Sequence, residues 1–408
     1  RITLKADGLL EVRTSGQWSE TNEDHEFTLW LANAHSAVGT FVDVSTEAGI
    51  IGNALGYGLS ATVSDINKDG WPDLYVANDY IEDDYLYVNQ GDGTFREAVR
   101  GWLDHTSYSS MGADIADYNN DGRPDIYTLD MLAEGNRRQK LLKGPEDFRF
   151  YRDMLARGYY HQYMRNMLHL SRGDTTFSEI GQLAGVSNTD WSWAALFADV
   201  DLDGLKDLYV TNGYRRDYTN LDYLSTELYG NFGFMKFLET GNEDHAALYA
   251  LTQKMPSTPI PNYAFRNEGD LTFEKKSAAW GVGHEGFSNG AAYGDLDGDG
   301  DLDLVVNNIN AEASVYRNRA REQTGHHYLT VRLEGEGGNR FGIGAKVRLT
   351  APSGRTFYQE MIPARGFQSS VQPALTFGLG AAESVDLTVT WPDQRKERRA
   401  GVAADQTV

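Results

Sequence analysis

The stretch Asp65-Ile66-Asn67-Lys68-Asp69-Gly70-Trp71-Pro72-Asp73 decides the fold, because three other segments superpose on it without gaps. These segments cover residues 117–125, 199–207 and 295–303, and all four have Asp at positions 1, 5 and 9 and Gly at position 6. A β-rich run follows each segment, and another strand-like run precedes it. Recurrence of one such unit along a chain indicates a repeat architecture.

A second half-repeat follows the first three of these segments. Residues 85–95, 168–177 and 264–273 each have the pattern of a β-hairpin around a Gly-Asp turn. Two strands around the Asp-rich segment and two in the hairpin make four strands per unit, which is typical of a propeller blade. We therefore expect an all-β fold, a β-propeller of four-stranded blades. Its innermost strands would carry the small residues that recur at one offset, Ala61, Ala113, Ala195 and Ala291.

The N-terminal residues continue the series in altered form. Residues 6–12 align with residues 68–74, and residues 29–41 align with the hairpin half. Five units are therefore visible, and the first is incomplete because its opening strand is missing. Since the chain opens at Arg1 without Met, we expect a mature or trimmed product.

Two long insertions interrupt the repeats, at about residues 132–166 and 219–256. Both lose the strand period and are rich in helix formers, so we expect helices there. Insertions in repeat proteins collect on one face and often shape the binding surface. The alternative is that these two only cap the propeller.

The Asp-rich segments have the spacing of a loop that wraps a hard cation. Oxygens at positions 1, 3, 5 and 9 point inward, Gly at position 6 permits the sharp turn, and the carbonyl at position 7 adds another oxygen. Calcium takes about six to eight oxygens in flexible geometry, whereas magnesium keeps its waters, so the pattern favours four Ca²⁺ ions. Position 12 is Val or Thr and a strand follows, so these loops are not EF-hands.

The predicted ligands fall into four sets of five, and the residue at position 7 acts through its main-chain carbonyl. The sets are Asp65, Asn67, Asp69, Trp71 and Asp73; Asp117, Asn119, Asp121, Arg123 and Asp125; Asp199, Asp201, Asp203, Leu205 and Asp207; and Asp295, Asp297, Asp299, Asp301 and Asp303. In the first unit Thr3 and Lys5 replace the ligands at positions 1 and 3, so we expect no ion there.

The charge of the chain supports this interpretation. Positions 1, 3, 5 and 9 of the four loops hold fourteen carboxylates, which repel one another strongly without cations. Four Ca²⁺ ions would change the formal net charge from −22 to −14. The alternative is that the acidic turns are solvated and hold no metal. We expect structural ions, because a catalytic cation needs open coordination and a nearby acid or base.

These residues resemble the FG-GAP/VCBS repeats of integrin-like β-propellers, over about residues 1–322. Four further motifs, at residues 342–345, 365–370, 377–380 and 391–393, resemble in sequence and order the ASPIC/UnbV domain. That domain follows such propellers in the cartilage acidic protein family and in bacterial surface or secreted proteins. The resemblance implies calcium binding, an extracellular or cell-surface location and a ring of six or seven blades. With five units visible, such a ring needs upstream sequence or closes unusually.

Residues 323–408 are expected to form a small β-sandwich packed on the propeller. Residues 327–333, 345–349, 356–361 and 385–391 alternate as strands do. The family's Trp-Pro-Asp/Ser-Gly turn is altered here, because Gln394 follows Trp391-Pro392-Asp393. The basic run at residues 395–399 has the pattern of a solvated edge strand that discourages pairing.

Composition excludes several classes of protein. A net charge of −22 repels nucleic acid and anionic lipid, so neither is an expected partner. The absence of Cys excludes disulfides and thiolate chemistry. No apolar run approaches the roughly 18 residues of a membrane span, so no membrane insertion is expected. A hydrophobic fraction of 40% is enough to build a core.

Two sets of residues outside the loops are candidates for function. Residues 286–290 match the Gly-x-Ser-x-Gly pattern of a nucleophile elbow, but Ser288 recurs as Ser110 and Ser192 at the same repeat offset, so we reject a catalytic role. Trp191 and Tyr214 lie in aromatic clusters on loops and are the best candidates for a ligand face, although such residues also pack helices onto sheets.

Three functions remain open. The first is a binding or scaffolding module, a calcium-stabilised propeller that presents its loops to a protein or polysaccharide; it requires no catalytic residues. The second is a carbohydrate-active enzyme, a lyase or dehydratase, and a cluster of His, Tyr and carboxylate beside an open metal position would favour it. The third is a subunit of a larger extracellular assembly, for which the incomplete first unit is the only sign.

Overall fold

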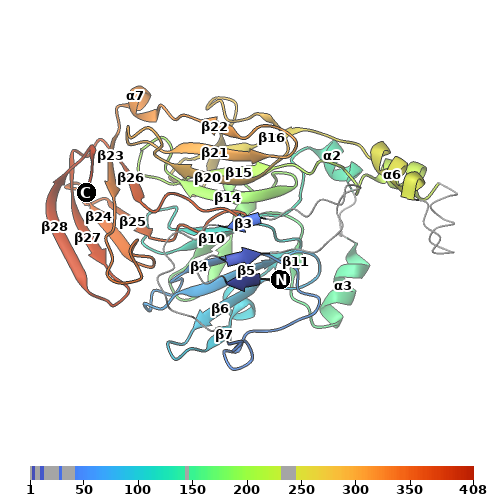
Figure 1. Ribbon diagram of the computed structural model, residues 1–408, viewed down its shortest axis with the longest axis horizontal. Helices are drawn as coiled ribbons and strands as arrows, with labels where there is room; N and C mark the ends of the chain where they lie inside the picture. Colours follow the sequence, from blue (N-terminus) through green and yellow to red (C-terminus); the bar gives the residue numbers. More distant parts are fainter. Residues whose placement is uncertain (1, 5–9, 13–26, 30–41, 143–146, 231–244) are drawn as a thin grey trace. The chain divides into compact units, whose positions relative to one another are not determined.

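The computed structural model describes residues 2–4, 10–12, 27–29, 42–142, 147–230 and 245–408 (Figure 1). The chain divides into two compact units, Arg1–Ser45 and Thr46–Val408. The first contains an antiparallel sheet of β1 (Ile2–Leu4), β2 (Leu10–Val12) and β3 (Phe27–Leu29). Thr3 lies in β1, whereas Lys5 and most of the expected N-terminal repeat lie outside the described residues.

The second unit contains four successive antiparallel sheets whose strands lie side by side in chain order. The first is β4 (Gly58–Ser64), β5 (Asp73–Asn78), β6 (Tyr85–Asn89) and β7 (Phe95–Glu97); the second is β9 (Ala113–Ala116), β10 (Asp125–Thr128), β12 (Met167–Ser171) and β13 (Phe177–Glu179). The third is β14 (Ser192–Ala198), β15 (Asp207–Asn212), β17 (Tyr263–Asn267) and β18 (Phe273–Lys275); the fourth is β20 (Ser288–Gly294), β21 (Asp303–Asn308) and β22 (Ser314–Tyr316). The predicted all-β class and the blade-like sheets are confirmed, and the number of blades in a ring stays a prediction.

The first strands of neighbouring sheets contact one another in chain order, β4 with β9, β9 with β14 and β14 with β20. The Thr62 hydroxyl donates to the Ala113 carbonyl at 3.1 Å, and a Cβ on Gly112 would lie 2.0 Å from the Trp193 carbonyl oxygen. Three of the four repeated alanines are buried at this junction, whereas Ala61 of β4 is exposed. Small residues therefore let the inner strands β9, β14 and β20 approach one another closely, as the sequence predicts.

Both insertions contain helices, as the sequence predicts. The first holds α2 (Asn136–Leu141) and α3 (Phe148–Ala156), and the second holds the π-helix η1 (Tyr223–Leu228) and α6 (His245–Lys254). The Asp147 side chain caps α3 by accepting from the Arg149 amide at 2.8 Å. Short elements complete this part: α1 (Val99–Trp102), α4 (Gly181–Ala184), the parallel pair β8 (Thr106–Ser107) and β11 (Gln162–Tyr163), and the pair β16 (Ile260–Pro261) and β19 (Glu285–Gly286).

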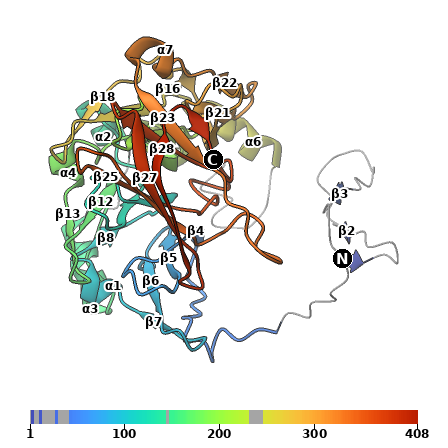
Figure 2. The ribbon, with the colours of Figure 1, turned by 90° about the vertical axis from the view of Figure 1, so that its left-hand side faces the viewer.

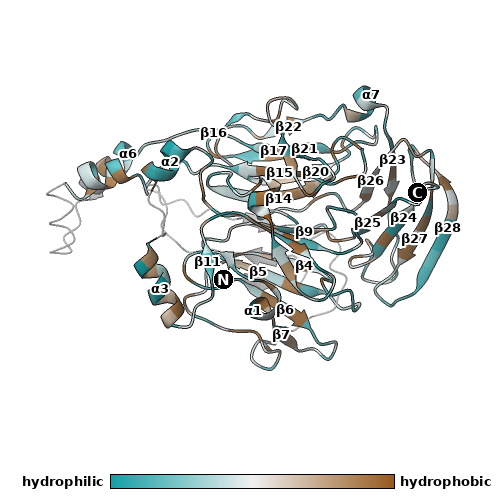
Figure 3. Ribbon diagram, turned by 180° about the vertical axis from the view of Figure 1, so that it is seen from behind, coloured by the Kyte–Doolittle hydropathy of each residue, from teal (hydrophilic) through white to brown (hydrophobic). Residues whose placement is uncertain are grey.

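The C-terminal residues form two sheets after α7 (Ala320–Thr324). One has the order β26 (Leu375–Gly380), β23 (His327–Val331), β29 (Gln406–Thr407); the other has the order β25 (Thr356–Glu360), β24 (Lys346–Thr350), β27 (Ser384–Thr390), β28 (Lys396–Ala403). The two sheets share one apolar core that includes Leu329, Val347 and Leu349. β28 is an edge strand with almost all of its residues exposed, and it is largely hydrophilic in Figure 3. This matches the expected basic edge strand.

One segment of the C-terminal domain reaches in among the inner strands of the repeats. Residues 364–370 form a tight loop between β25 and β26, closed by a bridge from Ala364 to Ser370. Gly366 pairs with Ala113 of β9, and Phe367 is buried in an apolar cluster with residues of β14, β20 and β21. In Figures 1 and 2 the strands β23 to β27 lie beside the repeat sheets. The contacts of Gly366 and Phe367 connect the two parts.

A buried carboxyl joins the first two sheets. Asp84 accepts hydrogen bonds from the Tyr75 hydroxyl at 2.7 Å, the Asn78 amide at 2.8 Å and the Ser110 hydroxyl of the next repeat at 2.8 Å. Burial nevertheless dominates these donors and raises the pKa of Asp84 to about 7. The group is therefore protonated in the folded protein at pH values where it is ionised in the unfolded chain.

We expect Asp84→Asn to remove a pH dependence of stability. Since the folded pKa is raised from 3.8 to about 7, the wild-type protein loses up to about 4 kcal/mol from this group as the pH rises through that interval. Because an amide cannot ionise, the free energy of unfolding of the variant should increase relative to that of the wild type as the pH rises. Urea denaturation at a series of pH values and fixed calcium concentration measures the difference. The exposed Asp104→Asn is the control; equal pH profiles for Asp84→Asn and wild type would contradict the expectation.

Candidate metal centres and an aromatic cavity

The four Asp-rich loops share one backbone geometry. The glycine at position 6 is left-handed in each, with φ of 100° at Gly70, 83° at Gly122, 89° at Gly204 and 97° at Gly300. Its amide donates to the side chain of the first Asp at 2.8 to 3.2 Å in all four loops. Glycine adopts this left-handed conformation without steric cost, and the turn that results directs its amide toward the first carboxylate.

The carboxylate at position 9 ties each loop to its own sheet. In the third loop Asp207 accepts from the Val200 amide and from the Asn267 amide of β17, both at 3.0 Å. The other three loops repeat both bonds, through Asp73, Asp125 and Asp303. One buried Asp therefore fixes the end of each sheet that carries the Asp-rich loop.

In the third and fourth loops, carboxylates are close enough to hold one cation. Oxygens of Asp199, Asp201 and Asp207 lie within 4.8 Å of one another, as do oxygens of Asp295, Asp297 and Asp303. The first and second loops have Asn67 and Asn119 at position 3, and their amide oxygens accept from the backbone of position 5 at 2.9 and 3.1 Å. The structure therefore brings together the carboxylates at positions 1, 3 and 9 of the third and fourth loops, whereas Asp203 and Asp299 at position 5 are not part of these groups.

Among the described residues, three buried carboxylate oxygens of the loops lack a hydrogen-bond partner in the protein. They are Oδ1 of Asp65, which is 1% exposed, Oδ1 of Asp199, which is 6% exposed, and Oδ1 of Asp301, which is 0% exposed. A buried carboxylate oxygen without a donor is costly, and a divalent cation would satisfy it. Oxygen-only donors of mixed carboxylate, amide and carbonyl type fit calcium, so the residues present fit the ion that the sequence predicts.

Burial and mutual repulsion act against the charged form of these groups. Burial is the largest effect and raises the pKa of Asp199 and Asp207 well above the usual range, and neighbouring carboxylates raise both further. Burial also raises the pKa of Asp73 to about 6. A cation in each loop would reverse this balance, since it favours the ionised carboxylates.

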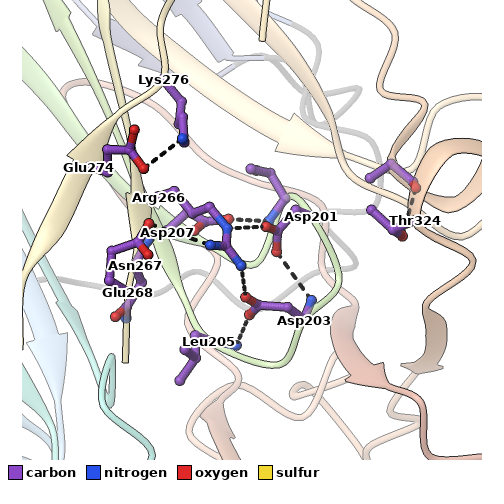
Figure 4. A network of polar contacts seen from close by, with 12 residues as sticks. Asp201, Asp203, Leu205, Asp207, Arg266, Asn267, Glu268, Glu274, Lys276 and Thr324 are labelled. Atoms are coloured by element: carbon purple, nitrogen blue, oxygen red, sulfur yellow. Dashed lines mark hydrogen bonds and ion pairs between the residues drawn. The ribbon is translucent and has the colours of Figure 1, made fainter. Parts of the chain in front are cut away.

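Two arginines that the sequence analysis did not single out neutralise the more acidic loops. Arg266 of β17 contacts Asp201 and Asp203 at 2.7 and 2.8 Å, and Figure 4 shows it between these two side chains. Arg317 contacts Asp297 and Asp299 of the fourth loop in the same way, at 2.6 and 3.1 Å.

The repeat register carries a signal for these arginines. Strand pairing places Val88 and Leu170 of the first two sheets where Arg266 and Arg317 stand in the last two. Loops with Asn at position 3 thus have an apolar residue at this site, and loops with Asp at position 3 have an arginine. The fourth carboxylate and its counter-charge therefore occur together.

The C-terminal domain contacts the ends of the sheets that carry the loops. Its direct bonds include an ion pair from Lys346 to Asp65, a bond from Arg355 to the Asp203 carbonyl at 2.7 Å, and a bond from the Asp295 amide to Gln372 at 2.8 Å. Lys206 of the third loop is buried and donates to the carbonyls of Asp117 and Tyr358 at 2.7 and 3.1 Å. All four loops therefore lie on the side of the repeats that faces the C-terminal domain.

The residues at position 7 have exposed or partly buried side chains in three of the loops, namely Trp71, Arg123 and Leu205. Asp301 differs, because its side chain is fully buried, with Oδ1 unpartnered and Oδ2 accepting from the Arg321 amide at 3.2 Å. Burial raises the pKa of Asp301 to about 7. The fourth loop thus offers a side chain as well as a carbonyl at this position.

The opposite ends of the strands surround a cavity of about 1230 Å³. Tyr214 lines it, whereas Trp191 is 8% exposed and stacks behind Tyr214 at 4.2 Å between ring centroids. Trp193, which the sequence analysis did not choose, lines the cavity beside Tyr214, and Phe367 and Gln368 of the 364–370 loop also contribute. Tyr214 is therefore the member of the predicted pair that is open to a ligand, and Trp191 supports it.

The Gly-x-Ser-x-Gly match has no catalytic surroundings. Ser288 lies in β20, is buried, and bonds to Asn308 and Asn262 at 2.8 and 3.0 Å. The equivalent Ser110 bonds to Asp84 of the preceding repeat. These hydroxyls hold neighbouring strands together, which agrees with the rejection of a nucleophile here.

Family models match most of this architecture. The model for the FG-GAP-like repeat matches residues 65–128, 151–210 and 248–306, and the model for ASPIC and UnbV matches residues 335–408. The chain is therefore an FG-GAP repeat protein with a C-terminal ASPIC/UnbV domain. None of the helices in the described ranges is long and apolar enough to cross a membrane.

Among curated proteins the chain is weakly homologous to cartilage acidic protein 1. It is 25% identical to the mouse protein over 89% of this chain and 46% of the relative, and 24% identical to the human protein over 88% and 44%. The chain thus spans a little under half the length of these relatives. Among solved structures it is similar to an Agrocybe aegerita lectin that recognises non-reducing terminal N-acetylglucosamine, with 15% identity and a TM-score of 0.29 over 84% of this chain and 80% of that one.

Proposed function

We propose that this chain is a calcium-stabilised extracellular binding or scaffolding protein that presents propeller loops to a protein or polysaccharide. The observation that carries the proposal is the separation of two features along the strands. The Asp-rich loops lie at one end of the sheets and contact the C-terminal domain, whereas a large cavity lies at the other end. Loops packed against a second domain suit structural ions, and the cavity end suits a ligand.

The extracellular location rests on the family resemblance and on weak homology to cartilage acidic protein 1. Four calcium ions are the proposed cofactors, each held by one loop with the ligand sets given above. Calcium at extracellular concentrations would keep sites of even modest affinity filled.

The enzymatic alternative finds less support in the residues of the cavity. Among the described residues that line it there is no His, Asp or Glu, and burial raises the pKa of Tyr218. A tyrosine with a raised pKa is a poor general base near neutral pH. The lining therefore favours binding over a lyase or dehydratase reaction.

A binding screen tests the proposal. The chain would be applied to arrays of glycans and of extracellular proteins, once in calcium and once after chelation with EDTA. We expect specific binding in calcium that is lost on chelation, because loss of the ions loosens the blades. The absence of any specific ligand in calcium would contradict a binding function, and turnover of an arrayed glycan would favour the enzymatic alternative.

A further inference from the structure

The cavity has a rigid aromatic wall. Tyr214 stacks on Trp191 at 4.2 Å with an interplanar angle of 18°, and Trp193 stacks beside Tyr214 at 6.5 Å. Trp193 is fixed in turn, because its indole donates to the Gly213 carbonyl at 3.0 Å and its ring lies 4.9 Å from that of Phe367. Flat aromatic faces that are held in place bind the faces of sugar rings without a large loss of side-chain entropy.

Two arginines lie in the same cavity, in the loop that follows β15. Among the described residues no carboxylate lies within ion-pair distance of Arg215 or Arg216. Arg216 donates to the Met255 carbonyl and to Gln253, both at 3.1 Å, and the amide of Asn310 lies 2.6 Å from Arg215. Both guanidinium groups therefore have donors to spare for an anion.

Two acids that lie close to this loop, Asp190 and Asp217, are neutralised outside the cavity. Arg138 of α2 forms ion pairs with Asp190 and with Asp217, the latter at 2.9 Å, and neither acid lines the cavity. In a chain with a net charge of −22, a cavity whose described lining holds two arginines and no carboxylate is a local site of opposite charge.

The size and the remaining lining suit an oligosaccharide. About 1230 Å³ exceeds the roughly 300–1,000 Å³ of typical small-molecule sites. Asn289, Asn307 and Gln368 also line the cavity, and their side-chain amides are of the type that hydrogen-bonds to sugar hydroxyl groups. β20, which lines the cavity, is the first strand of its sheet, so a peptide is the competing occupant, and the aromatic wall with the two arginines favours the oligosaccharide.

We propose that this cavity binds an anionic oligosaccharide, one that carries uronic acid carboxylates or sulfate groups. Tyr214 and Trp193 contact the sugar faces, and Arg215 and Arg216 bind the acidic groups. This inference rests on the proposed binding function and specifies its ligand class. The 364–370 loop of the C-terminal domain forms part of the site through Phe367 and Gln368, so both parts of the chain contribute to recognition.

Calorimetric titration of the full chain in calcium tests the proposal with three matched probes: tetragalacturonate, its fully methyl-esterified form and a sulfated maltotetraose. We expect the free acid or the sulfated probe to bind, and the neutral ester to bind at least tenfold more weakly. Arg215→Gln should weaken binding of the anionic probe at least tenfold, whereas Arg332→Gln, an exposed arginine in the C-terminal domain, should change it less than twofold. Melting temperatures of both variants show whether they are folded.

Several outcomes would overturn the inference. They are failure of both anionic probes to bind, equal affinity for acid and ester, an Arg215→Gln variant that binds like wild type, or displacement of the bound probe by an acidic peptide at equal charge concentration. Each of these leaves the binding function itself intact if the array screen finds a neutral glycan or a protein ligand. A screen without any ligand would reject both proposals together.

Discussion

Chelation of calcium with EDTA is expected to lower the melting temperature of this protein by at least about 10 °C. Each filled site contributes about 2.7 kcal/mol when free calcium is 100 times its dissociation constant, and four sites act on the same folded unit. Excess calcium should restore the original melting curve, and magnesium should restore little of it, because the loops offer more oxygens than magnesium uses. Scanning calorimetry in calcium, EDTA and magnesium measures all three states.

The variant Asp199→Asn distinguishes bound metal from a simple acidic turn. Asn keeps an oxygen that accepts from the Gly204 amide, as Asp199 does at 2.8 Å, but it removes one buried charge. In calcium we expect the variant to melt below wild type, because the third loop loses a ligand. In EDTA we expect it to melt at or above wild type, because burial and the neighbouring Asp201 and Asp203 act against the charge of Asp199.

The informative result is that Asp199→Asn lowers the melting temperature relative to wild type in calcium but not in EDTA. The exposed Asp104→Asn removes the same formal charge without touching a loop, and it should shift both melting curves equally. Identical melting of wild type in calcium and EDTA would contradict structural metal at these loops. A variant that is less stable than wild type under both conditions would indicate a purely structural role for the Asp199 carboxylate.

Local structure was predictable because it depends on residues close in sequence. Gly at position 6 with flanking Asp residues fixes a turn, the alternating runs fix the strands, and these signals recur in register at each repeat. Arg266, which pairs with Asp201 and Asp203, also occupies a fixed position in this register, so the repeat pattern carries a signal for that contact too.

The position of the C-terminal domain was not predictable in the same way. Lys346 reaches Asp65, and Arg365 reaches Asp114, across more than 200 residues, and no periodicity records such contacts. The choice of Trp191 over Trp193 shows the same limit. Trp191 directly precedes β14 and Trp193 lies in it, and only the fold places Tyr214 over Trp191 and leaves Trp193 lining the cavity.

Loss of the ion pair between Arg365 and Asp114 is expected to destabilise the protein by about 3–5 kcal/mol. The Arg365 Nε lies 2.8 Å from an Asp114 side chain that is 0% exposed. Asp114 also accepts from the Phe197 amide of β14 at 2.7 Å, and Arg365 donates to the Tyr293 hydroxyl of β20 at 3.0 Å. One buried pair thus connects β9, β14 and β20 with the 364–370 loop.

Arg365→Met should destabilise the protein more than Asp114→Asn does, because it leaves the Asp114 carboxylate buried without a counter-charge. Arg365→Met combined with Asp114→Asn removes both charges, so the double variant should lose less stability than the sum of the two single variants. Urea denaturation in calcium gives the coupling energy, and Arg332→Met is the control for loss of an exposed arginine. Additive effects, or a loss below about 0.5 kcal/mol for Arg365→Met, would mean that the 364–370 loop is held by Phe367 and its apolar neighbours instead of by this pair.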